Sequence, residues 1–269
     1  TGPEVVTAAE CDSVVKVKVG PALPPLAPTQ PPSILVEKSP AEKPAKLSAA
    51  EQARLQLVDL SEAYNIRAEE LTSTPLLFDN RQTPMTLADW WNNPPLTMPP
   101  TPPQIEAGNG VRFLMAGRPD GVAAANAPKS LVALTSWRPY PWPAGVTIPI
   151  GKPCEKVWLL LQNYVHPSKC YVPNGEVILH YADKKTATTS LIPPYNLDCY
   201  YQHFSREGVQ VPLGQYNLKK APDTAKLCHA DALAIPADPA RVLESVELRA
   251  TCSEGIIGLA GMSVLVSQP

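Results

Sequence analysis

Proline limits the fold of this chain more than any other residue type. The sequence holds 33 prolines and 14 glycines among 269 residues. Proline lacks a backbone N–H donor and breaks helix interiors, so a mainly helical fold is excluded. Six of the twelve positions in residues 21–32 are proline, and prolines recur through residues 75–103. We expect an extended polyproline-type linker in the first segment and a long ordered loop in the second.

From residue 110 onward, short apolar or alternating runs are separated by turn residues. This spacing is typical of an all-β sandwich or barrel. The predicted strands are 111–116, 131–137, 146–150, 156–162, 176–182, 186–192, 230–235, 243–250 and 256–266. A capping box from Ser48 to Glu51 predicts one short helix at about 49–56, and the alternation that follows it is compatible with a strand. The sequence therefore predicts an all-β fold, an antiparallel β-sandwich with one short helix.

The distribution of prolines and of alternating residues predicts three parts of the chain. Valine and lysine alternate over residues 15–19, which predicts a β segment within residues 1–20. This segment is either the tail of a preceding domain or a strand that docks elsewhere. Residues 21–47 are predicted to be a Pro-rich linker, and residues 48–269 a β-sandwich domain with a Pro-rich loop at 75–103. The chain starts at Thr1 without a signal-peptide pattern, which favours a processed piece of a larger precursor.

Charge and composition exclude several partners. The formal net charge is -2 and the sequence pI about 6.1, so the chain lacks the basic character of a nucleic-acid-binding protein. No apolar run reaches the roughly 18 to 20 residues of a membrane-spanning helix. The six cysteines include no Cys-x-x-Cys pair, which favours buried thiols or structural disulfides over a metal site and leaves their pairing open.

The first candidate site is the aromatic segment at residues 137–142. Trp137, Tyr140 and Trp142 lie within six residues, and the prolines between them favour an extended backbone. Flat rings of this kind stack on the apolar C–H faces of sugars. The alternative is that these rings pack into the core beneath the Pro-rich loop.

The second candidate site is a polar segment in a predicted long loop at residues 193–229. Asparagine, aspartate, glutamine and histidine side chains can hydrogen-bond a polyol, while a tyrosine stacks on it. The residues concerned are Asn196, Asp198, Tyr200, Gln202 and His203. The same side chains can instead form the polar network that orders the loop.

Catalytic and metal sites are less well supported. His166 and Cys170 are residue types that form catalytic nucleophile–base pairs, but the sequence shows no third group to orient the base. A glycoside hydrolase needs two carboxylates about 5 to 10 Å apart, and no pair stands out among Glu155, Glu176, Asp183, Asp198, Asp231, Glu244 and Glu247. His180 and His229 share no recognised metal-ligand spacing.

Four stretches together resemble a known family. They are VDLSEAYN (58–65), GVRFLMAGRPDG (110–121), YPWPAGVTIPIGKPCEKVWLLLQNYV (140–165) and GEVILHYADKK (175–185). This order is similar to that of galactose-binding-like β-sandwich (jelly-roll) modules of bacterial glycan-processing proteins, including novel putative carbohydrate-binding modules. The likeness covers about residues 55–266. Lys184 departs from the pattern, because a turn glycine is usual at its position.

The resemblance implies a noncatalytic accessory domain of a larger extracytoplasmic protein, either extracellular or in the periplasm or cell envelope. Its partners would be a polysaccharide or other glycan and a catalytic domain or neighbouring subunit. Many such modules carry a structural calcium, and no other cofactor is expected. Two alternatives stay open: a structural or assembly protein whose N-terminal strand and Pro-rich arm clasp neighbouring subunits, and a fragment of a glycoside-active enzyme.

Overall fold

A computed structural model describes residues 45–75, 86, 102–123, 126–137, 140–165, 169–201, 208–218 and 221–268, with 214–218 and 221–227 described by their backbone alone. The chain divides into two units, Thr1–Pro40 and Ala41–Pro269, and every described residue belongs to the second. The predicted β segment at 1–20, most of the linker and nearly all of the Pro-rich loop lie outside the described residues.

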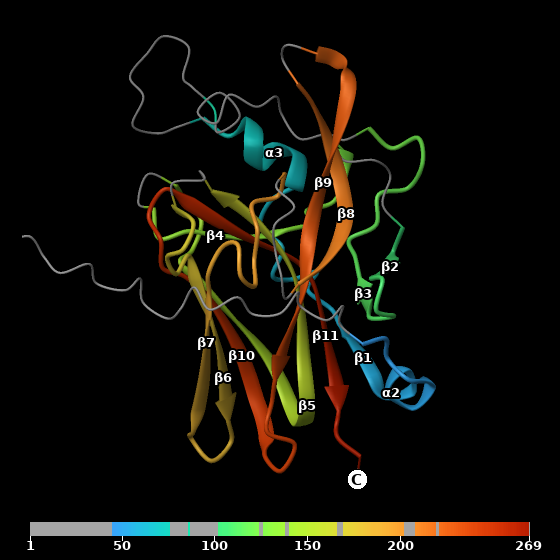
Figure 1. Ribbon diagram of the computed structural model, residues 1–269, viewed down its shortest axis with the longest axis vertical. Helices are drawn as coiled ribbons and strands as arrows, with labels where there is room; N and C mark the ends of the chain where they lie inside the picture. Colours follow the sequence, from blue (N-terminus) through green and yellow to red (C-terminus); the bar gives the residue numbers. More distant parts are fainter. Residues whose placement is uncertain are drawn as a thin grey trace, which may run out of the picture. The chain divides into compact units, whose positions relative to one another are not determined.

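The described fold is built from antiparallel strands, as predicted (Figure 1). Two short helices, α2 (Ala49–Arg54) and α3 (Ala68–Ser73), accompany the strands. The strands are β1 (Leu55–Val58), β2 (Gln104–Glu106), β3 (Arg112–Leu114), β4 (Val132–Leu134), β5 (Gly145–Val165), β6 (Gly175–Tyr181), β7 (Thr186–Leu191), β8 (Val209–Leu218), β9 (Ala221–Pro236), β10 (Val242–Ala250) and β11 (Gly255–Val266).

Strand β5 belongs to two packed layers. Its residues 145–153 pair with β10, which pairs in turn with β6, and β6 with β7. We call these strands the outer sheet. Residues 154–165 of β5 pair with β11 on one side and with β9 on the other. With β1, β4 and β8 they form the central sheet. The chain changes sheet near Gly151, which has a φ of +71°, so the predicted break between 146–150 and 156–162 lies at this corner.

The core consists of two apolar clusters. One fills the space between the two sheets, with Leu159, Leu179 and Val246 among its fully buried members. The other lies on the opposite face of the central sheet, where α3 and the β2–β3 hairpin cover it with residues such as Leu71 and Phe113. Alternate side chains of the central strands therefore enter different clusters, as a strand buried on both faces requires.

The structure confirms the capping box at α2. The Glu51 backbone N–H donates to Ser48 Oγ, and the Ser48 N–H donates to a Glu51 carboxylate oxygen. The strand β1 follows directly, so the alternation after the helix is indeed a strand.

The prediction of a loop at 193–229 is wrong for the second half of this range, because β8 and the first half of β9 lie there. Val209, Val211 and Leu213 alternate, and Val211 and Leu213 are buried. Pro212 lies inside β8, where a register shift and the edge position of the strand tolerate its missing N–H donor. Pro149 likewise lies inside β5, opposite the β-bulge of β10.

Candidate functional site

The structure brings the two predicted site segments to one end of the sandwich. Four loops meet there, and we call their described residues the loop end: 135–137 with 140–144, 169–174, 192–201 and 251–254. Each loop is hydrogen-bonded to the next: Ser136 Oγ donates to the Cys252 carbonyl at 2.8 Å, the Thr251 N–H to the Asn174 carbonyl at 3.0 Å, and the Tyr171 N–H to the Pro193 carbonyl at 2.6 Å. The aromatic loop 135–144 is thus linked to loop 192–201 through the two loops between them.

Three aromatic rings form a stack in the first of these loops. The Tyr140 and Trp142 rings are parallel, with centroids 5.0 Å apart and planes 2° apart. The Trp137 ring is tilted by 59° to the Tyr140 ring, with centroids 5.2 Å apart. The Thr135 N–H donates to the Pro143 carbonyl and closes the loop that carries these rings. Tyr140 is buried, while Trp137 and Trp142 are each partly exposed.

This stack has features of both a sugar-stacking site and a part of the core, the two alternatives for this segment. All three rings pack against the core cluster that covers the central sheet. Burial raises the pKa of Tyr140 well above its usual value, so the central ring belongs to the core. Trp142, by contrast, rests with one face on Tyr140 and keeps part of its surface accessible. A fixed and partly exposed indole is the element that a sugar-stacking platform requires.

The predicted polar residues lie deeper than a ligand contact requires. Asn196, Asp198 and Tyr200 are exposed by 8%, 1% and 0%. Gln202 and His203 lie outside the described residues. Both ends of the Asn196 amide bind backbone: its Oδ1 accepts from the Ile192 N–H and its Nδ2 donates to the Ser190 carbonyl. Asn196 thereby covers the unpaired edge of β7 at Ser190, near the end of the strand.

Asp198 and Tyr200 belong to a short segment wedged between two strands. β5 and β9 pair as far as Leu161 and Asp231 and then separate. Residues 198–201, which we call the wedge, enter the gap: the Tyr200 N–H donates to the Asn163 carbonyl, and the His229 N–H donates to the Tyr200 carbonyl. The buried Asp231 carboxylate accepts from the Asp198 N–H at 2.7 Å. These polar groups therefore bind the protein's own backbone and order the loop, which is the alternative to ligand binding that the sequence left open.

Sequence reasoning missed the most exposed aromatic residue of the loop end. Tyr171 is 67% exposed, with Val172 beside it at 44%. Its ring meets Tyr195 edge-on, with centroids 5.9 Å apart. The only signal in the sequence was a tyrosine next to a valine in a short loop, which is too weak to single out.

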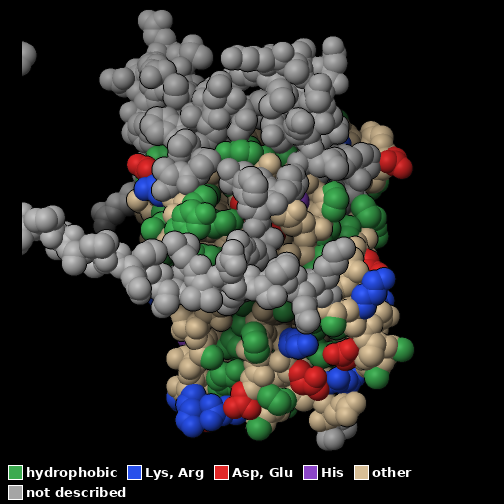
Figure 2. All heavy atoms as spheres, viewed as in Figure 1, with side chains coloured by type: hydrophobic (Ala, Val, Ile, Leu, Met, Phe, Trp, Pro, Cys, Tyr) green, Lys and Arg blue, Asp and Glu red, His purple; other side chains and the backbone are tan. Residues whose placement is uncertain are grey.

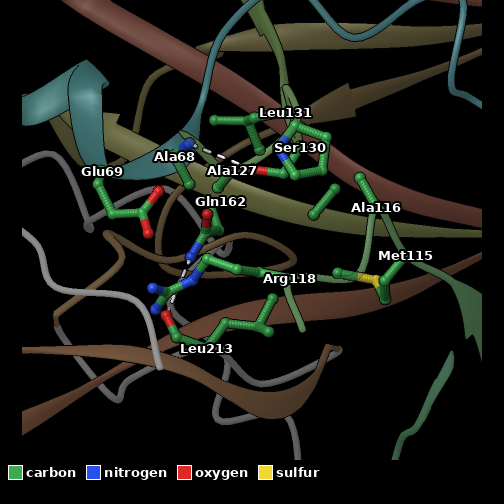
Figure 3. Close-up of a pocket in the computed structure, with 12 residues that line it drawn as sticks. Ala68, Glu69, Met115, Ala116, Arg118, Ala127, Ser130, Leu131, Gln162 and Leu213 are labelled. Carbon is green, nitrogen blue, oxygen red and sulfur yellow. Dashed lines mark hydrogen bonds between the residues drawn. The ribbon is translucent and has the colours of Figure 1, made fainter. Parts of the chain in front are cut away.

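The described residues also line hollows outside the loop end. Figure 3 shows the first, where Glu69, Arg118 and Gln162 point toward one small space between α3 and the central sheet. Its volume is about 20 Å³, enough for a single water molecule and too small for a sugar.

The second hollow is an open groove of about 370 Å³ on the outer sheet, near the β6–β7 turn. His180 Nε2 lies 2.9 Å from a Glu247 carboxylate oxygen, and Arg249 contacts the same carboxylate at 2.6 Å. Its lining charges are of both signs, and its one aromatic lining residue, Tyr181, is buried. On the face in Figure 2, lysine, arginine and acidic side chains are likewise intermingled over the described surface.

Nothing among the described residues forms a metal cluster of three or more His, Cys, Asp or Glu side chains. Five of the seven candidate carboxylates pair with basic side chains: Glu155 with Arg54, Glu176 and Glu247 with Arg249, Glu244 with Lys184 and Asp183 with Arg241. His166 lies outside the described residues. Burial raises the pKa of the Cys170 thiol, and the nearby Asp198 raises it further, which opposes the thiolate that a nucleophile needs.

The five cysteines in the described part of the chain are free thiols. Burial raises the pKa of Cys199 and of Cys228 to about 12, so both are inert structural thiols. No helix in the described ranges is long and apolar enough to cross a membrane.

Comparison with known protein families finds none that matches the chain, and no curated protein matches its sequence.

Proposed function

We propose that this protein is a noncatalytic carbohydrate-binding domain of the galactose-binding-like jelly-roll type, an accessory part of a larger extracytoplasmic protein. The single observation that supports this function most is the parallel stack of Trp142 on Tyr140. An indole that lies flat on a buried ring has lost its rotational freedom before ligand arrives, which lowers the entropic cost of binding.

The polar partners of this site differ from the ones that the sequence indicates. Asn196 and Asp198 already bind backbone groups, and Tyr200 is enclosed. Hydrogen bonds to a sugar would therefore come from the exposed loop 251–254, which adjoins the aromatic loop. A ligand role for Gln202 and His203 stays a prediction.

The test is affinity electrophoresis in gels that contain galactan, xylan, glucomannan, hydroxyethylcellulose or glycol chitin, with reducing-sugar release measured in the same samples. We expect at least one polymer to retard the wild type without sugar release. Trp142→Ala should lose the retardation and Trp142→Phe should keep part of it. Val242→Ala is the matched control, because Val242 is an exposed apolar residue at the start of β10, whereas loop 251–254 follows the other end of that strand. Equal retardation of Trp142→Ala and wild type would refute this platform.

One observation favours a second function, assembly by strand addition. β7 pairs only with β6 among the described strands, and its sequence TATTSL carries no charge. The Tyr181 N–H donates to the Lys185 carbonyl, so the backbone groups of Thr186, Thr188 and Ser190 point away from β6. Asn196 covers only the Ser190 end. An uncharged open edge of this kind accepts strands from other molecules.

Native mass spectrometry over a range of concentrations tests this second function. Thr188→Pro removes an outward N–H without a loss of pairing to β6, so it should abolish any oligomer. A wild type that stays monomeric at every concentration would exclude assembly through β7.

A further inference from the structure

Tyr171 combines two properties that folding does not explain. Its side chain is the most exposed large apolar one among the described residues, at 67%. Its φ is +65°, in the left-handed region where a residue with a Cβ is disfavoured and glycine or asparagine is the ordinary choice. A residue that adds little to the core has thus been placed in a strained backbone position.

The surrounding residues hold Tyr171 in this conformation. Its N–H donates to the Pro193 carbonyl at 2.6 Å. The Asn174 amide donates to the carbonyls of Lys169 and Val172, each at 2.9 Å, and so fixes the loop on both sides. Tyr195 supports the ring from the side, at an interplanar angle of 74°. Strain that several contacts maintain is typical of binding sites.

The polar loop 251–254 adjoins both the aromatic loop and the Tyr171 loop. Loop 251–254 contacts the aromatic loop through Ser136 and the Tyr171 loop through Asn174. Thr251, Ser253 and Glu254 are exposed on this loop, and Glu254 pairs with Lys169 at 3.2 Å. Hydroxyl, carboxylate and ammonium groups on a loop that adjoins both aromatic segments match a chain of sugar units, which alternates apolar faces and hydroxyls along its length.

We propose that Tyr171, supported by Tyr195, is a second stacking platform, and that the ligand is an oligosaccharide chain that lies across loop 251–254 between Trp142 and Tyr171. This inference rests on the proposed carbohydrate-binding function and names its ligand class: a chain of several sugar units rather than a single sugar or a chain end.

The experiment uses the polymer that retards the wild type most and the oligosaccharides of two to six units prepared from it. Binding is measured by titration calorimetry on the full chain. The variants are Tyr171→Gly, Tyr171→Phe and Trp142→Ala. Tyr171→Gly removes the ring and also relieves the left-handed strain, so its Tm should equal or exceed that of the wild type, which separates loss of binding from loss of folding.

We expect Tyr171→Gly to weaken binding of the longest oligosaccharides by about tenfold, the scale of one aromatic stacking contact. Disaccharide binding should not change, and Tyr171→Phe should bind as the wild type does. Trp142→Ala should weaken binding at every chain length.

Other outcomes separate the two proposals. If Trp142→Ala loses binding while Tyr171→Gly matches the wild type at all lengths, the second platform is refuted and the proposed function stands. If only Tyr171→Gly loses binding, the Trp142 platform fails. If no glycan binds, both fail. If Tyr171→Gly instead dissociates an oligomer in native mass spectrometry, Tyr171 anchors a protein contact and the inference is overturned.

Discussion

Asp231 is the residue whose replacement should affect the loop end most. It is fully buried on β9, and its carboxylate accepts from the Asp198 N–H at 2.7 Å and lies 3.7 Å from His229 Nε2. Asp231→Ala removes the acceptor but leaves the Asp198 N–H buried. A buried donor without a partner costs about 1–3 kcal/mol, and the loss of a charged acceptor favours the upper half of that range.

For a domain of this size, a loss of about 2–3 kcal/mol corresponds to a fall in Tm of roughly 4–12 °C, at about 2–4 °C per kcal/mol. Thermal unfolding followed by circular dichroism measures it. Hydrogen exchange adds a local measurement, because the amides of Asp198, Tyr200 and His229 should exchange faster if the wedge detaches. These amides bond to Asp231, Asn163 and Tyr200 in the intact protein.

Two variants make the result specific. Asp231→Asn keeps an oxygen that can accept the same bond, so it should lose less stability than Asp231→Ala. Glu244→Ala removes a carboxylate whose partner Lys184 is 81% exposed, and it should change the stability by less than about 1 kcal/mol. The account of the wedge would be refuted if Asp231→Ala melted with the wild type and left the Tyr200 amide protected.

Three further predictions concern the sandwich itself. Lys184 has a φ of +68° in the β6–β7 turn, so Lys184→Gly should raise Tm by a few degrees, since the left-handed conformation costs about 1 kcal/mol or more for a residue with a Cβ. A Cβ on Gly175 would lie 2.3 Å from Ile257 Cδ1 and 2.6 Å from the Arg249 carbonyl; Gly175→Ala should therefore destabilise the fold by about 1–3 kcal/mol in urea unfolding. Burial raises the pKa of Glu247, but bonds from Arg249 and His180 outweigh it and leave the pKa below the usual 4.5. The stability from this carboxylate is present above about pH 4.5 and lost at lower pH, so the Tm difference between wild type and Glu247→Gln should shrink as the pH falls.

The fold class followed from the sequence because each strand carries its own local pattern. The strands predicted at 176–182 and 243–250 are β6 and β10, with bounds shifted by one residue at most, because an alternating pattern indicates a strand buried on one face. The prediction of a loop where β8 lies was wrong, because polar residues and Pro212 obscure the alternation of Val209, Val211 and Leu213. The helix α3 was missed because six residues show no helical period and its N-cap residue, Arg67, makes no side-chain cap.

The candidate site was predicted in part, for a physical reason. Sequence spacing brought out Trp137, Tyr140 and Trp142, and the structure stacks them. Spacing does not reveal which polar groups the backbone of a loop will occupy, so Asn196 and Asp198 looked available for a ligand. Tyr171 gave almost no signal, because its N–H bonds to the carbonyl of Pro193, which is far from it in the sequence. The Asn174 amide fixes the rest of the loop through the carbonyls of Lys169 and Val172, and the sequence does not show that pairing.

Nuclear magnetic resonance of the indole N–H groups tests the central claim most directly. The chain has five tryptophans, and Trp158, which is 2% exposed in the central sheet, provides an internal reference. During titration with the retarding glycan, the Trp142 indole signal should shift in proportion to occupancy while the Trp158 signal stays in place. A bound glycan that leaves the Trp142 signal unmoved would contradict the stacking platform at the loop end.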